Sequence, residues 1–126
     1  MPEVTKDKNE KISKLNFGSI YTHYLNRIVK HNRTKEELDQ LILWLTGYDQ
    51  NKLNYFIAGN GTFGDFFLGA HIHQNAHMIK GVVCGYRIEE IPEKFALYRD
   101  CRRMEKLIDE LAKGRKMQKI LRQEKS

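Results

Sequence analysis

Residues 33–49 read RTKEELDQLILWLTGYD, and this stretch decides the fold class of the chain. Thr34 is followed three residues later by Glu37, which is the spacing of a capping box at the start of a helix. Gly47 stands where a helix commonly ends in the left-handed conformation. Apolar side chains recur between these signals at helical spacing: Leu38, Leu41, Ile42 and Leu45. The stretch therefore predicts a helix with two marked ends and one buried face.

Similar signals recur on both sides of this helix. Upstream, Ser19 is a good N-cap, and downstream Asp49 and Thr62 are candidate caps of two further helices. Residues 93–113 form the longest periodic segment, in which apolar side chains recur at steps of three and four: Leu97, Cys101, Met104, Ile108 and Leu111. Gly114 interrupts this pattern, and a last short helix is expected after it.

These segments predict a compact all-α fold of about six helices, in a single domain that spans residues 15–126. Residues 1–14 are polar and lack periodicity, which predicts a flexible N-terminal arm. One segment is ambiguous. Asn75 is a candidate cap for a helix over residues 76–85, but the β-branched residues and glycines of residues 81–88 also fit a short strand. A strand there would make the fold α+β.

The composition excludes several classes of protein. The chain has 126 residues, of which 40% are hydrophobic and 30% are charged. Its longest apolar run, Leu41–Leu45, is far shorter than the roughly 20 residues that a membrane helix needs. The N-terminal residues lack the apolar segment of a secretory signal, and two cysteines without a CxxC pair make no disulfide framework. We therefore expect a cytoplasmic protein that does not bind membranes.

Positive charge is concentrated at the C-terminus. The formal net charge is +6, and most of the surplus lies in a basic tail, residues 113–126. Because lysine and arginine neutralise phosphates, this tail makes nucleic-acid binding an alternative function. The residues that would carry it are Lys113, Arg115, Lys116, Lys119 and Arg122. The other interpretation of the same pattern is a solvated helix face.

Three of the 5 histidines lie in the stretch HIHQNAH, residues 71–77. His71, His73 and His77 therefore make a metal-dependent enzyme a further alternative. A zinc site takes three or four protein ligands, yet no histidine follows His77 and the nearest upstream carboxylate is Asp65. We favour a solvated loop and expect neither a metal nor another cofactor. The sequence also lacks the P-loop, GxSxG and HExxH motifs, which favours a protein that is not an enzyme.

Two strings of the sequence resemble a known family. They are WLTGYDQ (Trp44–Gln50) and CGYRIEEI (Cys84–Ile91), and the string KLIDELAKGRKMQKILR follows them. In this order and at this distance they resemble the small uncharacterised bacterial proteins called domain of unknown function 2200. The resemblance covers roughly Phe17 to Arg122. It implies a bacterial cytosolic protein and transfers no catalytic or binding residue, and the histidine stretch lies outside the family pattern.

The first two strings also suggest a binding groove. Their aromatic side chains combine an apolar ring with a polar tip, and charged residues stand beside them, as is typical of ligand sites. The set is Trp44, Tyr48, Asp49, Tyr86 and Arg87. We therefore expect a non-catalytic binding domain, a monomer or a homodimer, whose partner is an unknown protein or a small molecule. The alternative is structural: Trp44 completes the core, Asp49 caps a helix and Arg87 pairs with a nearby acid.

Overall fold

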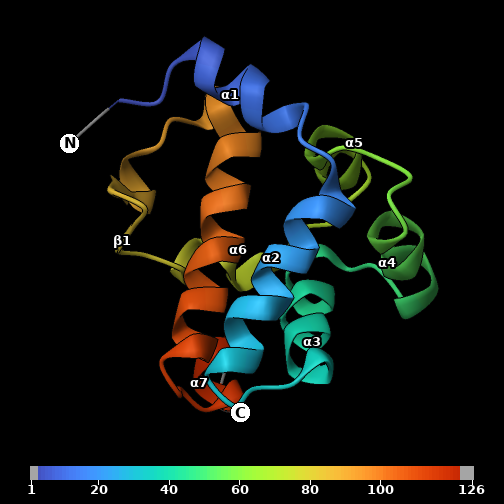
Figure 1. Cartoon of the computed structure of the whole chain (residues 1–126). Helices are drawn as coiled ribbons and strands as arrows, with labels where there is room; N and C mark the ends of the chain where they lie inside the picture. Colours follow the sequence, from blue (N-terminus) through green and yellow to red (C-terminus); the bar gives the residue numbers. More distant parts are fainter. Residues whose placement is uncertain (1–2, 123–126) are drawn as a thin grey trace.

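The structure is a computed structural model that describes residues 3–122, and it is mostly helical (Figure 1). The described residues form seven α-helices: α1 (Lys6–Ser13), α2 (Phe17–Lys30), α3 (Lys35–Thr46), α4 (Gln50–Ile57), α5 (Phe63–Leu68), α6 (Ala96–Ala112) and α7 (Met117–Ile120). Two short strands, β1 (Val82–Val83) and β2 (Tyr86–Arg87), pair as an antiparallel hairpin. Short 3₁₀ turns cover Gln74–Met78, Ile88–Glu90 and Glu93–Phe95. The predicted compact, mostly helical domain is thus confirmed, with a small hairpin added to it.

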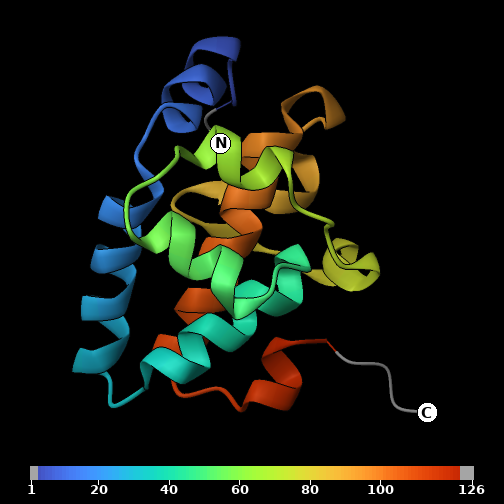
Figure 2. The same cartoon turned by 90° about the vertical axis from the view of Figure 1, so that its right-hand side faces the viewer.

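Helix α6 is the centre of the fold. It has 17 residues, and its apolar stripe is buried along the whole length. Figure 1 shows α2 running beside α6, α1 crossing near its N-terminal end and α7 lying at its C-terminal end. Turned by 90°, the molecule shows α3 and α4 on the face beside α6 (Figure 2). The helices therefore surround one central helix and do not form a flat layer.

Helix α3 has both of the ends that its sequence predicts. The Thr34 hydroxyl accepts from the Glu37 backbone N–H at 3.2 Å, and the Glu37 carboxylate accepts from the Thr34 N–H at 3.0 Å. Gly47 ends the helix with a φ of 74°, and a Cβ there would lie 3.1 Å from the His71 carbonyl oxygen. Glycine therefore suits both the positive φ of the turn and the close approach of the backbone at His71. The next helix, α4, begins directly after its own N-cap, Asp49.

The helix predicted over residues 76–85 is wrong, and the strand alternative is confirmed. Only the 3₁₀ turn Gln74–Met78 forms, and its cap is His73 instead of Asn75. The hairpin follows, and its two turn residues, Cys84 and Gly85, have φ angles of 52° and 82°. Two positive φ values fit a type I′ turn, whose twist matches that of the paired strands. The β-branched valines of β1 thus outweigh the weak helical pattern.

The N-terminal arm predicted over residues 1–14 is wrong for most of its length. Residues 1–2 lie outside the described part, but Lys6–Ser13 form α1, which the Thr5 hydroxyl caps through the Lys8 N–H at 3.2 Å. Helix α1 packs against α6 and α5, and Ile12 contacts the core. A helix with one apolar anchor is stable here because tertiary packing supports it. At the other end, residues 123–126 of the predicted tail are outside the described part.

Among residues 3–122, no helix has the length and apolar character needed to cross a membrane.

Gly18 allows α2 to approach the end of α4 closely. A Cβ at this position would lie 2.5 Å from the Ile57 carbonyl oxygen, which belongs to the backbone and has little freedom to move. We expect Gly18→Ala to lower the free energy of unfolding by about 1–3 kcal/mol, because overpacking forces the two helices apart. Urea denaturation measures this loss. The exposed His23→Ala substitution on the same helix is the control and should change stability by less than about 0.5 kcal/mol.

Candidate functional site

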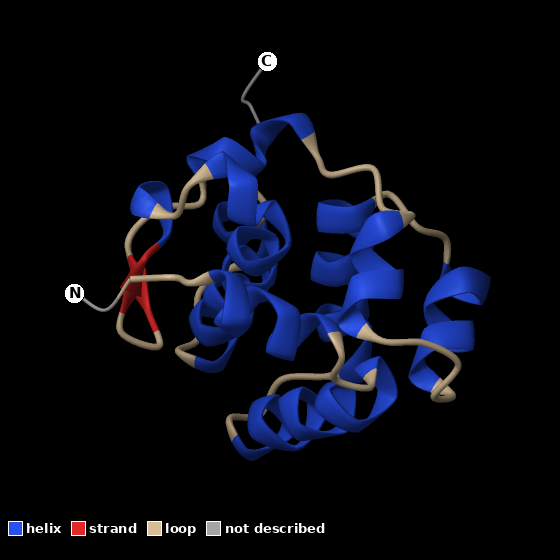
Figure 3. Cartoon of the chain, turned by 90° about the horizontal axis from the view of Figure 1, so that it is seen from above, coloured by secondary structure: helices blue, strands red, loops and turns tan. Residues whose placement is uncertain are grey.

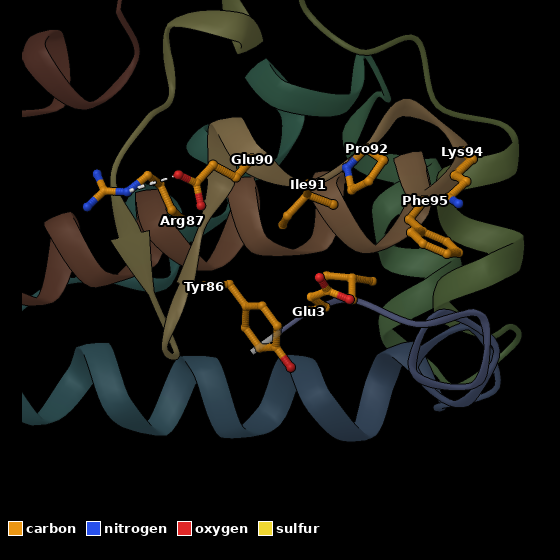
Figure 4. A pocket seen from close by; sticks show the side chains of 9 residues that line it. Glu3, Tyr86, Arg87, Glu90, Ile91, Pro92, Lys94 and Phe95 are labelled. Carbon is orange, nitrogen blue, oxygen red and sulfur yellow. Dashed lines mark ion pairs between the residues drawn. The ribbon is translucent and has the colours of Figure 1, made fainter. Parts of the chain in front are cut away.

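A pocket of about 410 Å³ lies between the N-terminal segment, the hairpin and the residues that lead into α6 (Figure 4). Viewed from above, the hairpin is at the margin of the helical body, next to the N-terminal segment (Figure 3). The apolar part of the lining is Val4, Ile91, Pro92 and Phe95, and the charged part is Glu3, Arg87, Glu90 and Lys94. Tyr86 of β2 completes the lining. The lining of the pocket is therefore divided about equally between apolar side chains and polar or charged ones.

Tyr86 is the most strongly held polar residue of this pocket. Only 9% of it is exposed, and its ring meets that of Tyr98 edge to face, with the centroids 5.4 Å apart. Lys8 Nζ donates to the Tyr86 hydroxyl at 2.9 Å. The Arg102 guanidinium lies over both rings, 4.8 Å from the centroid of Tyr98 and 5.4 Å from that of Tyr86. Two cations thus surround a pair of tyrosines.

These cations and the tyrosine pair shift the two phenol pKa values in opposite directions. The hydrogen bond from Lys8 lowers the pKa of Tyr86, and the neighbouring Tyr98 hydroxyl lowers it further. Burial raises the pKa of Tyr98, and the neighbouring Tyr86 hydroxyl has the same effect. Because donors stabilise the phenolate of the residue that accepts them, Tyr86 is the more acidic member of the pair.

Arg87 and Glu90 belong to the rim of the pocket. Their side chains form an ion pair of 3.8 Å between Nε and Oε1, and about half of Arg87 is exposed. Figure 4 shows the Arg87 guanidinium extending toward Glu90 and away from Tyr86. An exposed pair of this length is worth little. Arg87 can therefore reorient at low cost, and the expected pairing with a nearby acid is present.

The structure divides the five predicted groove residues between two places. Tyr86 and Arg87 line the pocket, whereas Trp44, Tyr48 and Asp49 are not part of its lining. The expectation of one shared groove is corrected, because the two strings lie on different sides of the fold. The hydrophobic contacts of Tyr86 are with Ile91 and Tyr98, in a small core apart from the main one.

The other three residues have structural roles. The Trp44 indole stacks on the His73 ring with centroids 4.2 Å apart, and within the described structure its buried Nε1 has no hydrogen-bond partner. The Tyr48 hydroxyl donates to the Phe66 carbonyl oxygen at 2.5 Å. Asp49 Oδ1 accepts from the Lys52 N–H at 2.8 Å and so caps α4. The structural alternative for Trp44 and Asp49 is thus the one that the structure bears out.

Sequence reasoning missed Lys8, Tyr98 and Arg102, as well as the N-terminal wall of the pocket. The polar composition of residues 1–14 predicts a flexible arm, and a flexible arm gives Lys8 no fixed partner. One signal was present, since Thr5 stands three residues before Lys8 at the spacing of an N-cap. The four-residue spacing of Tyr98 and Arg102 also places both side chains on one face of a helix. Their proximity to Tyr86 follows only from the tertiary structure.

A second, more open hollow of about 540 Å³ lies along α3 and α4, around the buried Asp39. Tyr21 donates to one oxygen of this carboxylate, and Lys35 Nζ at 2.5 Å and Gln50 Nε2 at 3.1 Å donate to the other. Burial and the hydrogen bond to Asp39 raise the pKa of Tyr21 well above its usual value. Asp39 is satisfied by groups of the protein itself, so this network holds α2, α3 and α4 together.

The three clustered histidines point to no metal centre. The described residues contain no group of three His, Cys, Asp or Glu side chains able to hold a metal ion. His73 Nδ1 accepts from the Asn75 N–H at 2.9 Å and its ring covers Trp44. His71 and His77 are exposed, and His77 Nδ1 lies 2.8 Å from the Gln74 carbonyl oxygen. The histidine nearest the core is therefore occupied with capping and stacking.

Three of the five predicted nucleic-acid residues pair with carboxylates of α6. Arg122 donates from both Nη atoms to Glu110 at 2.6 and 2.8 Å, and Arg115 Nη1 lies 3.1 Å from the same carboxylate. Lys113 Nζ lies 3.0 Å from Asp109. Of the five predicted nucleic-acid residues, the remaining two are Lys116 and Lys119, and both are exposed. Arg115 and Arg122 thus fasten the chain end onto α6, whereas Lys113 pairs with a residue of the helix that it caps.

Comparison with known proteins identifies the family. A family model described as an uncharacterized protein conserved in bacteria, DUF2200, matches residues 11–122. The chain belongs to the DUF2200 family. A solved structure, the crystal structure of the uncharacterized protein SP1917, is 33% identical and has a TM-score of 0.82, with 89% of this chain and 91% of that chain covered. A search of curated proteins finds no match. The resemblance seen in the sequence is therefore confirmed, and the pocket lies inside the matched region except for its N-terminal wall.

In this DUF2200 protein, Tyr86 should be an early-ionising tyrosine. The Lys8 ammonium stabilises its phenolate, so Lys8→Met should raise the pKa of Tyr86. An alkaline titration followed by phenolate absorbance measures this, with Tyr86→Phe identifying the step that belongs to Tyr86. Tyr24→Phe is the control, because burial raises the pKa of Tyr24 and its loss should leave the earliest step in place. An unchanged early step in Tyr86→Phe would contradict the assignment.

Glu110 should be important for the folded C-terminal end of the domain. Its carboxylate is 8% exposed and receives both Arg122 and Arg115. Glu110→Gln leaves Arg122, which is 13% exposed, without a carboxylate, and we expect a loss on the order of 3 kcal/mol in the free energy of unfolding. Thermal or urea denaturation measures the loss. The exposed Glu36→Gln has the same charge change and should be nearly neutral.

Proposed function

We propose that this DUF2200 protein is a non-catalytic cytoplasmic binding domain that holds a small molecule in the pocket at Tyr86. The observation that carries the proposal is the position of the string CGYRIEEI, residues 84–91. This string supplies Tyr86, Arg87, Glu90 and Ile91 to the lining. One of the two strings that mark the family in the sequence therefore supplies much of the lining of the more enclosed of the two hollows.

The lining indicates the kind of molecule that would bind. Val4, Ile91 and Phe95 offer apolar contact, while Tyr86 and four charged side chains make up the polar part of the lining. A ligand with an apolar body and one polar end would bury its body against the walls and reach Tyr86 with its end. The volume of about 410 Å³ lies in the range of small-molecule sites and is too small to enclose a folded partner.

The nucleic-acid alternative has less support than this proposal. Three of its five residues are paired with carboxylates of α6: Lys113, Arg115 and Arg122. Each paired cation would have to give up its carboxylate before it could neutralise a phosphate. Counterion release, which provides the affinity in such binding, scales with the number of phosphates neutralised. The two exposed lysines that remain would give only weak and salt-sensitive binding.

The proposal is tested with 4-phenylbutan-1-ol, a neutral probe with an apolar body and one polar end. We expect the methyl resonances of Val4 and Ile91 to shift on addition of the probe, as followed by NMR of methyl-labelled protein. Val4→Trp fills the pocket from the N-terminal segment and should abolish the shifts. Leu68→Trp places the same side chain on α5, where Leu68 is 87% exposed, and should leave them unchanged. Shifts that persist in Val4→Trp, or none in the wild type, would contradict binding at this pocket.

A further inference from the structure

We propose that residues 3–14 form a lid that opens as one unit about Asn16 and closes on a ligand held in the pocket at Tyr86. The lid consists of α1 and the residues that flank it, and two of its residues, Glu3 and Val4, form one wall of the pocket. Its opening is a property of the fold by itself, whereas its closure on a ligand rests on the proposed function.

The lid has little hydrophobic attachment to the rest of the fold. Figure 1 shows α1 on the outside, across the N-terminal end of α6. No residue of the lid is buried, and α1 has only 8 residues. The apolar contacts of the lid are those of Val4 and Ile12, which pack as partly buried side chains on the small core around Tyr86. An isolated helix of this length is marginal in water, so α1 is folded only while its contacts hold it.

Polar contacts provide the rest of the attachment. Lys8 Nζ donates to the Tyr86 hydroxyl at 2.9 Å, and Asn9 Oδ1 accepts from the Tyr98 N–H at 3.1 Å. The second bond caps α6 from outside, because its own N-cap residue, Phe95, makes no side-chain cap. The ion pairs of α1 join residues of the same helix and do not fasten it to its neighbours. Since hydrogen bonds to protein replace hydrogen bonds to water, these two contribute little net stability, and the lid can open at low cost.

The lid ends at a firm boundary. Asn16 forms an isolated antiparallel bridge with Thr62, and one hydrogen bond of this bridge runs from the Phe17 N–H to the Gly61 carbonyl oxygen at 3.0 Å. The Phe17 side chain is fully buried in the main core. Opening beyond the bridge would expose this ring to water, which is costly. A segment that detaches from the N-terminal side therefore detaches as far as Asn16 and stops there.

Opening of the lid changes the pocket and its surroundings together. The wall formed by Glu3 and Val4 leaves, Tyr86 loses the hydrogen bond from Lys8, and α6 loses its cap from Asn9. The apolar lining that remains belongs to the turns between the hairpin and α6. A ligand that contacts both this lining and the lid binds the closed form alone. Such a ligand holds the lid closed, because binding to one of two states shifts the population toward that state.

The opening is tested by native-state amide hydrogen exchange of the full chain without ligand, followed by NMR. We expect the hydrogen-bonded amides of α1 to exchange at least about a hundredfold faster than those of Phe17 and Leu107, after correction for intrinsic rates. The α1 amides should also share similar protection, as one opening unit requires. Protection that declines steadily toward the N-terminus would show fraying and would overturn a lid that moves as one unit.

Two isoleucine substitutions separate opening of the lid from unfolding of the whole domain. Ile12→Ala removes the contact of α1 with the core and should speed α1 exchange about tenfold. Ile28→Val removes a methylene from a fully buried side chain of α2 and should speed exchange at Leu107 about fivefold. It should leave α1 exchange unchanged, because the open form keeps the contacts of Ile28. If α1 exchange rises together with that of Leu107 in Ile28→Val, α1 opens only by global unfolding and there is no lid.

Closure on a ligand is tested with 4-phenylbutan-1-ol. At about nine times its dissociation constant the probe should slow α1 exchange about tenfold, because it stabilises the closed form relative to the open one. Bound probe with unchanged α1 exchange overturns closure on the ligand and leaves the pocket standing. Absence of binding overturns this closure together with the proposed function, whereas the opening of the lid is decided by the exchange rates without probe.

Discussion

The burial of the apolar stripe of α6 is the constraint on which the rest of the structure depends. Leu107, Ile108 and Leu111 are fully buried in α6, although eight of the 17 residues of this helix are charged. Each such side chain contributes about 1.5–3 kcal/mol when it leaves water, so the helix is stable only when neighbours cover the stripe. Helices α1, α2, α3, α5 and α7 all pack against it. The two ends of the described chain are thereby brought to opposite ends of one helix (Figure 1).

The same helix also supports the hairpin beside the pocket. Tyr98, from its N-terminal half, forms with Tyr86 and Ile91 a small core separate from the main one, and the Arg102 guanidinium lies over both tyrosine rings. Three segments distant in the sequence meet there: residues 3–8, the hairpin with its following turns, and the first turns of α6. A junction of this kind leaves a hollow, because no single element is shaped to fill it.

The accuracy of sequence reasoning followed the range of the interactions involved. The capping box of Thr34 and the C-terminal Gly47 depend on neighbours within four residues, so α3 could be predicted with both ends. The N-cap of α4, Asp49, could be predicted for the same reason. Helix α1 could not be predicted, because Ile12 is its one anchor in the core and its stability comes from α6 and α5. The five predicted groove residues do not lie in one place. An aromatic side chain in the sequence can line a site, but the sequence does not specify which residues its ring will contact in the fold.

Charge illustrates the same limit in a second way. The excess of lysine and arginine after residue 112 suggests nucleic-acid binding. In the fold, however, Arg115 and Arg122 both form ion pairs with Glu110 of the same chain. Lys8 lies in a part of the chain where acidic and basic residues nearly balance, and no composition argument singles it out. In the fold it meets a tyrosine that is also held by Tyr98 and Arg102. The electrostatic effect of a cation therefore depends on its partner: a carboxylate cancels its charge, whereas a neutral phenol leaves the charge in place and has its own pKa lowered.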